Sequence, residues 1–278
     1  MRVPGTDRVV NQLHGWDDGT LPHDWLLASS LLTREAAAGR PCFVASKPSY
    51  EKSGFTAATL AGVHPISAKE LDGRVDAAVD AAAQNPGALV YVYAPELDQA
   101  GHAHGSESEV WGQVLERLDS AAGRLSRTVP RGVGAVITAD HGMVDVPAHR
   151  HRLLGADDPL LHDVALIGGE PRMLHLYVEG GAEAACEAVA QRWRAAEGSR
   201  AWVLTREQAL AAGVFGAVAE HTRERIGDVL VAARAEVAYY DDRVTDKRPQ
   251  QMIGQHGSFT DAERIVPLIP LGAFAPPR

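Results

Sequence analysis

Three short segments, far apart in the chain, each place aspartate or histidine beside glycine. They are Ala94–Gly105 (APELDQAGHAHG), Thr138–Met143 (TADHGM) and Gly254–Gly257 (GQHG). Carboxylate and imidazole groups together are ligands that zinc and similar divalent metal ions bind in proteins. Because three such segments occur in one chain, we expect a metal site that the fold assembles from all of them.

The spacing within the segments supports this expectation. Asp98 and His102 are four residues apart, so one turn of helix would place both side chains on the same face. Asp140 and His141 are adjacent, and neighbours in a strand point to opposite faces, so they converge only if the strand has ended and the chain turns. The glycine that follows them makes such a turn easy. His256, which has a glycine on its C-terminal side, can supply a third contribution from a distant segment.

Each segment taken alone has a simpler interpretation. Asp98 and His102 could form an ordinary surface ion pair. Asp140 could stabilise a turn through local hydrogen bonds of its side chain. Taken jointly, the three segments favour a metal site over these alternatives. The remaining histidines that we considered are expected to be structural or solvated rather than ligands: His104, His149, His151, His162 and His221.

The composition limits the kinds of partner. A net charge of −9 argues against binding of a nucleic-acid polymer, which needs a basic surface. No apolar run is long enough to cross a membrane, and Met1–Gly5 does not begin an apolar signal region. Cys42 and Cys186 are too few for a disulfide framework and fit a reducing compartment. These features predict a cytoplasmic protein that acts without a membrane; the oligomeric state is not readable.

Runs typical of strands alternate with runs typical of helices. We expect strands at 42–46, 88–93, 133–139, 173–178, 202–204 and 228–233, and helices over 107–126, 182–196 and 206–212. This order predicts a single α/β domain over 1–278, with a mostly parallel sheet flanked by helices on both faces. Asp140 and His141 would then lie just beyond the carboxyl end of a strand, where open α/β sheets place their sites.

The combined motifs resemble the type I phosphodiesterase/nucleotide pyrophosphatase family of the alkaline phosphatase superfamily. The resemblance rests on 91–105, 137–147 and 253–258, and it covers most of the chain. It implies an alkaline-phosphatase-like core and a site for two divalent metal ions, usually zinc.

Matched residue by residue, the resemblance implies that Asp98, His102 and His256 bind one metal ion. It implies that Asp140 and His141 bind the other. The implied activity is hydrolysis of phosphodiester or pyrophosphate bonds in a small phosphate ester or nucleotide, by in-line displacement between two metals.

The resemblance also implies a further metal-binding aspartate and a Thr or Ser nucleophile on an N-terminal strand. Neither is found here, so we expect the nucleophile upstream of Met1, in a strand that this core lacks. The segment Asp17–Gly19 and the hydroxyls of Thr56 and Ser258 are in the wrong context. A missing strand would leave an apolar sheet edge, which lowers stability and invites self-pairing.

Other functions stay open. The chain could be a non-catalytic remnant that binds metal or nucleotide, or a superfamily member such as a phosphomonoesterase, a sulfatase or a cofactor-independent phosphoglycerate mutase. Lys47, Tyr50 and Lys52 could face the same cleft, and the run 149–152 could contact phosphate or simply form a solvated loop. The residues that bind the substrate do not follow from the sequence.

Overall fold

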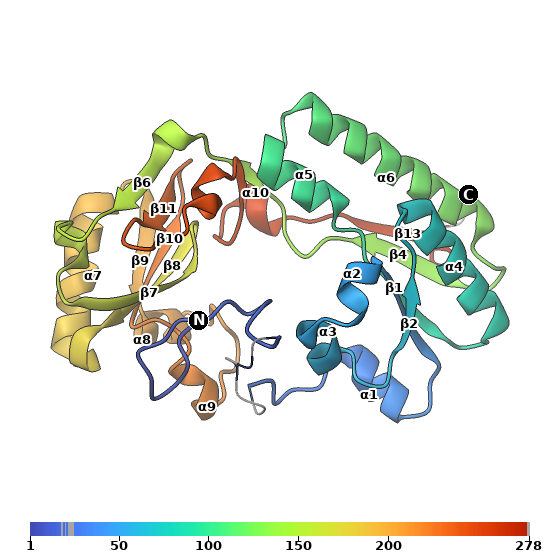
Figure 1. The fold of residues 1–278 in the computed structure, drawn as a ribbon, viewed down its shortest axis with the longest axis horizontal. Helices are drawn as coiled ribbons and strands as arrows, with labels where there is room; N and C mark the ends of the chain where they lie inside the picture. Colours follow the sequence, from blue (N-terminus) through green and yellow to red (C-terminus); the bar gives the residue numbers. More distant parts are fainter. Residues whose placement is uncertain (18, 20, 22–24, 277–278) are drawn as a thin grey trace. The chain divides into compact units, whose positions relative to one another are not determined.

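The computed structural model describes residues 1–17, 19, 21 and 25–276 (Figure 1). Asp18, in the middle of the Asp17–Gly19 segment, lies outside the described residues. The contacts divide the chain into two compact units, each assembled from separate stretches of sequence. Unit 1 comprises 1–10, 100–108 and 140–266, and unit 2 comprises 11–99, 109–139 and 267–278. The single domain expected over 1–278 stays a prediction.

Unit 2 contains a three-stranded parallel sheet made of β1 (Cys42–Ser46), β2 (His64–Ser67) and β3 (Leu89–Val92), with β1 in the middle. Val44 and Ala45 of β1 are buried because the sheet is covered by a helix, α4 (Leu71–Gln84). The other helices of unit 2 are α1 (Leu31–Ala37), α2 (Pro48–Glu51), α3 (Gly54–Thr59) and α6 (Glu109–Thr128). A separate antiparallel pair joins β4 (Gly134–Thr138) to β13 (Leu268–Gly272).

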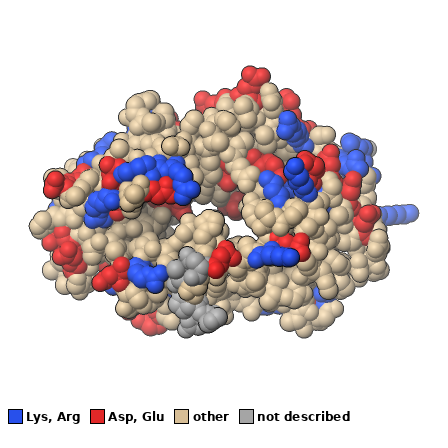
Figure 2. All heavy atoms as spheres, viewed as in Figure 1, with Lys and Arg blue, Asp and Glu red and all other residues tan. Residues whose placement is uncertain are grey.

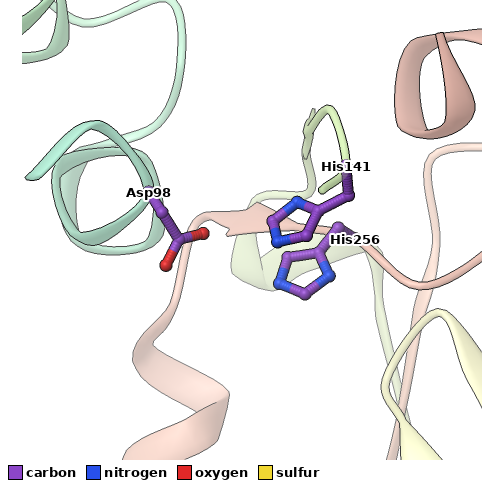
Figure 3. A group of neighbouring side chains, drawn as sticks. All are labelled: Asp98, His141 and His256. Atoms are coloured by element: carbon purple, nitrogen blue, oxygen red, sulfur yellow. The ribbon is translucent and has the colours of Figure 1, made fainter. Parts of the chain in front are cut away.

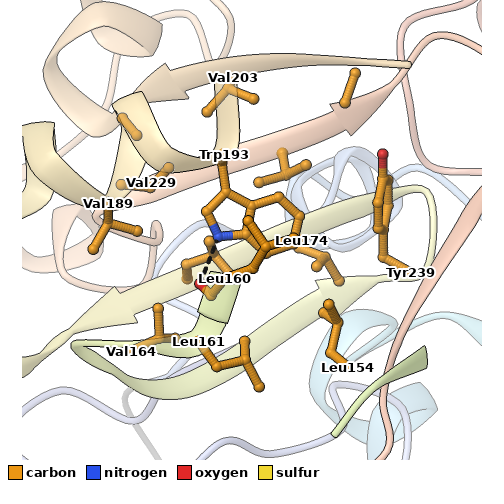
Figure 4. Packing of buried hydrophobic residues seen from close by; sticks show 14 of the residues in the cluster. Leu154, Leu160, Leu161, Val164, Leu174, Val189, Trp193, Val203, Val229 and Tyr239 are labelled. Carbon is orange, nitrogen blue, oxygen red and sulfur yellow. Dashed lines mark hydrogen bonds between the residues drawn. The ribbon is translucent and has the colours of Figure 1, made fainter. Parts of the chain in front are cut away.

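Unit 1 contains a four-stranded antiparallel sheet in the order β7-β8-β10-β9. Its strands are β7 (Val164–Glu170), β8 (Met173–Val178), β9 (Ala201–Thr205) and β10 (Val229–Ala233). One face is covered by α7 (Glu183–Glu197), whose Trp193 is fully buried in the main core cluster (Figure 4). The Trp193 indole N–H donates to the Leu160 carbonyl oxygen at 2.9 Å, so this large side chain is buried without an unsatisfied polar atom.

Short elements complete unit 1. Two small strand pairs join β5 (Val144–Asp145) to β12 (Gly254–Gln255) and β6 (His151–Leu154) to β11 (Ala238–Asp241). The short helices are α8 (Arg206–Ala211), α9 (Glu220–Arg223) and α10 (Asp261–Arg264). The 3-10 turns are η1 (Ala148–Arg150), η2 (Pro159–Leu161), η3 (Glu179–Gly181) and η4 (Arg248–Gln251). Within the described part of the chain, every helix is too short or too polar to cross a membrane.

The expected strands and helices are present, with ends that differ by no more than two residues. The prediction of a mostly parallel sheet is confirmed for β2-β1-β3. It is wrong for the sheet that contains β8, β9 and β10. The helix between β8 and β9 does make those two strands parallel to each other, as a βαβ crossover requires. However, β10 lies between them and pairs antiparallel with both. Strand β7, which the sequence did not reveal, adds a further antiparallel pair through a tight hairpin to β8.

Each unit holds one of the two cysteines in its core. Cys42 in β1 of unit 2 is 1% exposed, and Cys186 in α7 of unit 1 is 8% exposed. Neither cysteine forms a disulfide.

Candidate metal centre

The first motif forms a helix, α5 (Glu96–His104), which carries Asp98 and His102 one turn apart as their spacing predicted. This one continuous helix contains residues of both units: Asp98 belongs to unit 2 and His102 belongs to unit 1. The His102 Nδ1–H donates to the carbonyl oxygen of Gly254 at 2.8 Å. The backbone N–H of Ile253 donates to the His102 carbonyl oxygen, also at 2.8 Å. These two bonds tie the helix to the segment that carries His256.

The second motif turns directly after β4, as expected. The His141 Nδ1–H donates to the Gly142 carbonyl oxygen at 2.9 Å. Only glycine fits at position 142, because a Cβ there would lie 2.0 Å from the Ala262 carbonyl oxygen. The close approach lets the Gly142 N–H donate to the Glu263 carbonyl oxygen at 2.7 Å.

Four of the predicted ligands converge. The imidazoles of His141 and His256 stack with ring centroids 3.6 Å apart, and those of His102 and His256 are 5.1 Å apart. Asp98, His141 and His256 each offer a ligand atom, and these atoms all lie within 4.8 Å of one another (Figure 3). In Figure 3 the Asp98 carboxylate points from its helix toward both rings.

The grouping differs in detail from the one that the resemblance implies. The close group joins Asp98 and His256 with His141, whereas the resemblance joins them with His102. The Asp140 side chain is 83% exposed, and its Oδ1 lies 3.7 Å from His141 Nε2. The division of the five residues between two ions therefore stays a prediction.

The donor set suits a divalent metal ion. Two of the three imidazoles are bonded at Nδ1 to a backbone carbonyl, which fixes the tautomer and makes Nε2 the basic nitrogen. Histidines that bind metals in proteins are oriented in this way by a bond from the other ring nitrogen. A carboxylate with several such imidazoles matches the ligands of zinc. The residues present therefore fit the metal that the motifs predict.

Glu170 is an acidic residue near this group that the sequence did not predict. Glu170 ends β7, and a Cβ on Gly257 would lie 3.1 Å from the Glu170 Cβ, so the two segments are in contact. Burial raises the pKa of the Glu170 carboxyl, and the charges of the N-terminal ammonium, His102 and His141 act against that rise. A lone glutamate at a hairpin turn carries no local signal of such a neighbourhood.

Two of the other residues considered for substrate binding contact α5, the helix that carries Asp98. Lys47 Nζ lies 3.2 Å from Glu96 Oε1 and 3.1 Å from Gln99 Oε1, and the Tyr50 hydroxyl accepts from the Gln99 side-chain amide at 3.1 Å. Lys52 is exposed.

The basic run 149–152 is also occupied by internal contacts. Arg150 pairs with Glu236, and Arg152 pairs with Asp158 at 2.6 Å. The run therefore makes structural ion pairs within unit 1.

The two hydroxyls weighed as nucleophiles have structural partners as well. Ser258 is buried, and its hydroxyl donates to the Ala233 carbonyl oxygen. The Thr56 hydroxyl lies 3.0 Å from that of Ser53, at the beginning of α3.

The fold and this cluster define a class of protein. A model of the family described as type I phosphodiesterase / nucleotide pyrophosphatase matches residues 4–259. The chain belongs to this family.

Individual relatives in this family match only part of the chain, at low sequence identity. Ectonucleotide pyrophosphatase/phosphodiesterase family member 7 of Mus musculus is 26% identical over 138 residues, which are 47% of this chain and 30% of that protein. An uncharacterized pyrophosphatase/phosphodiesterase of Schizosaccharomyces pombe is 31% identical over 75 residues, covering 25% of this chain and 15% of that protein. The chain thus spans less than a third of the length of these curated relatives.

Solved structures share the α/β fold. Human ectonucleotide pyrophosphatase/phosphodiesterase 5 superposes with a TM-score of 0.63 at 16% identity, over 86% of this chain and 62% of that one. The murine protein, solved as an inactive threonine-to-alanine variant in complex with AMP, gives 0.62 at 18% identity, over 85% and 61%. Phosphonoacetate hydrolase from Sinorhizobium meliloti, in complex with phosphonoacetate, gives 0.60 at 15% identity, over 86% and 67%.

Proposed function

We propose that this chain belongs to a metal-dependent hydrolase of phosphodiester or pyrophosphate bonds whose substrate is a small phosphate ester or nucleotide. The observation that carries the proposal is the convergence of Asp98, His141 and His256 from three distant segments, with ligand atoms within 4.8 Å of one another. Membership of the type I phosphodiesterase/nucleotide pyrophosphatase family supports the reaction class. The AMP complex of the murine relative supports a nucleotide as substrate.

We assign Asp98, His102 and His256 to one zinc ion and Asp140 and His141 to a second. When bound, the two ions supply Lewis-acid activation of the attacking oxygen and stabilisation of the leaving oxygen in an in-line displacement. The protein's own part is orientation: His102 and His141 are each held at Nδ1, so each ring presents its Nε2 in a set direction.

We place the nucleophile in a segment upstream of Met1. Ser258 is buried with its hydroxyl committed to Ala233, and Thr56 lies at the beginning of a short helix. The inactivity of the murine relative that has lost a threonine supports a threonine nucleophile in the family. If no such segment serves this chain, the alternative is a protein that binds metal or nucleotide without turnover.

The surface favours a small substrate over a nucleic-acid polymer. The net charge is −9, and on the face shown in Figure 2 basic side chains lie among acidic ones. A polymer of phosphates would need a continuous basic track instead.

The first experiment is to count zinc ions per folded chain, in the protein as given and in the variants Asp98→Ala and His256→Ala. We expect two ions, with at least one lost in each variant, because each residue offers a ligand atom to the cluster. His221→Ala is the matched control, because His221 is exposed on α9 and should leave the count unchanged.

One ion that is lost in both variants would support the centre but contradict the two-ion assignment for this chain. No bound zinc would overturn the metal-dependent function. In a version that carries the upstream segment, faster hydrolysis of a bis-aryl than of a mono-aryl phosphate ester is expected; the reverse order would favour a phosphomonoesterase.

A further inference from the structure

A buried ion pair joins two distant parts of unit 1. Arg172 and Glu263 are 1% and 2% exposed. Arg172 Nε donates to Glu263 Oε1 at 3.0 Å, and Nη2 donates to Oε2 at 2.8 Å. The guanidinium also donates to the carbonyl oxygens of Ala235 and Val237. The guanidinium thus binds the carboxylate through two hydrogen bonds, and its other donors are satisfied by backbone carbonyl oxygens.

Such a pair is a costly way to fill a core. Removing two charges from water is expensive, and apolar residues of similar volume often stabilise a fold as well or better. The contacts of Glu263 indicate a role beyond stability.

Glu263 holds both loops that carry the stacked histidines. Its carbonyl oxygen accepts from the Gly142 N–H at 2.7 Å, one residue after His141. Its Oε1 accepts from the Ser258 N–H at 3.0 Å, two residues after His256. A single residue therefore sets the positions of two loops that are more than a hundred residues apart in sequence.

We propose that Arg172 and Glu263 are positioning residues of the metal centre, which set the spacing of the His141 and His256 imidazoles without contacting the metal or the substrate. The proposal rests on the proposed function, because it takes the two histidines as ligands. Arg172 acts through Glu263: it orients the carboxylate so that Oε1 faces Ser258 while the helix α10 keeps the Glu263 carbonyl on Gly142.

The test compares two double variants that each remove a pair of charges from unit 1. Arg172→Met/Glu263→Leu removes the proposed positioning pair. Arg206→Met/Asp228→Leu is the matched control, since Arg206 and Asp228 form a 2.7 Å pair that is largely withdrawn from solvent, with side chains 18% and 9% exposed. The side chains of that control pair bond to each other, to the Ile226 carbonyl oxygen and to the Val178 N–H, which lie outside the His141 and His256 loops.

The first measurement is the zinc dissociation constant, by competition with a chromogenic chelator. We expect the Arg172/Glu263 variant to bind zinc about 10- to 100-fold more weakly, the usual effect of losing a residue that orients a metal ligand. The zinc dissociation constant of the control variant should stay within about twofold of that of the unchanged protein. This comparison is made between proteins of equal thermal midpoint. Equal weakening in both variants, or none in either, would overturn the proposal.

The second measurement does not depend on metal. In metal-free protein with ¹⁵N-labelled histidine, the ring resonances of His141 and His256 should shift in the Arg172/Glu263 variant and not in the control, because stacked rings shield each other. Unshifted rings would refute the positioning role even if zinc never bound. If the ring resonances shift but the protein binds no zinc, the positioning role would stand and the proposed function would be wrong. If the double variant does not fold, Glu263→Gln, which keeps one acceptor oxygen, replaces it in both measurements.

Discussion

At the scale of single residues, the site depends on backbone groups as much as on ligands. The clearest example is Asp145, whose carboxylate accepts from the Ser106 N–H at 2.8 Å, the Ser106 hydroxyl at 3.0 Å and the Glu107 N–H at 3.2 Å. Gly105 has a φ of +86°, and a Cβ there would lie 2.6 Å from Asp145 Oδ2. The end of α5, and with it His102, is thereby fastened to β5.

We expect Asp145→Ala to lower the free energy of unfolding by about 2 kcal/mol, because bonds from the backbone to a charged acceptor are lost. Urea unfolding followed by circular dichroism measures the loss. Asp261→Ala is the control, since Asp261 is 74% exposed and pairs with an exposed Arg264, so its loss should stay within about 0.5 kcal/mol. Similar losses in the two variants would contradict the role given to Asp145.

At the scale of elements, strand β8 carries an ionisable group into the core of unit 1. All six residues of β8 are buried, and His175 among them accepts a hydrogen bond from the Gly227 N–H at its Nδ1 (3.1 Å). Burial, together with the charges of the N-terminal ammonium and Arg206, lowers the pKa of His175 from 6.5 to about 4. The folded protein therefore keeps this imidazole neutral at a pH where the unfolded chain would protonate it.

The lowered pKa of His175 makes the folded protein less stable in acid. Between pH 6.5 and about 4 the unfolded state binds more protons at His175, so its contribution to stability is complete above pH 6.5 and is lost as the pH falls. The loss amounts to about 3 kcal/mol. We expect His175→Asn, whose side-chain oxygen can still accept from Gly227, to remove this part of the acid sensitivity. Urea unfolding at both ends of the range measures it, and parallel pH curves for the two proteins would refute the assignment.

At the scale of the whole molecule, unit 2 presents strands with unpaired edges. In the described residues β3 ends its sheet, and β4 pairs on one side only. Tyr91 of β3 is 46% exposed, although parallel sheets are normally covered on both faces, and Val136 of β4, in the antiparallel pair with β13, is 48% exposed. The further N-terminal strand stays a prediction.

We expect a version extended upstream by that strand to have a higher thermal midpoint and weaker self-association than this chain, because the added strand would cover an apolar edge. Differential scanning calorimetry and light scattering measure the two effects. An extension of equal length made of Gly and Ser is the control, since it cannot pair in the same way. Equal midpoints for all three versions would rule out a missing strand.

The sequence predicted what depends on neighbours along the chain. Asp98 and His102 share a helical turn because their spacing requires only local structure, and the turn at Asp140 follows from a strand that ends before it. The insertion of β10 between β8 and β9 was not predictable, because strand order depends on distant pairing. The same holds for Arg172 and Glu263, which are 91 residues apart and show no pattern that links them.

The two buried thiols give each unit its own reporter of local opening. Burial raises the pKa of both Cys42 and Cys186, so in the native state each is shielded from a thiol reagent and is largely protonated. Reaction at either one therefore requires the surrounding core to open. Because one cysteine lies in each unit and the chain has two in all, the two labelling rates under native conditions would show whether the units open together or separately.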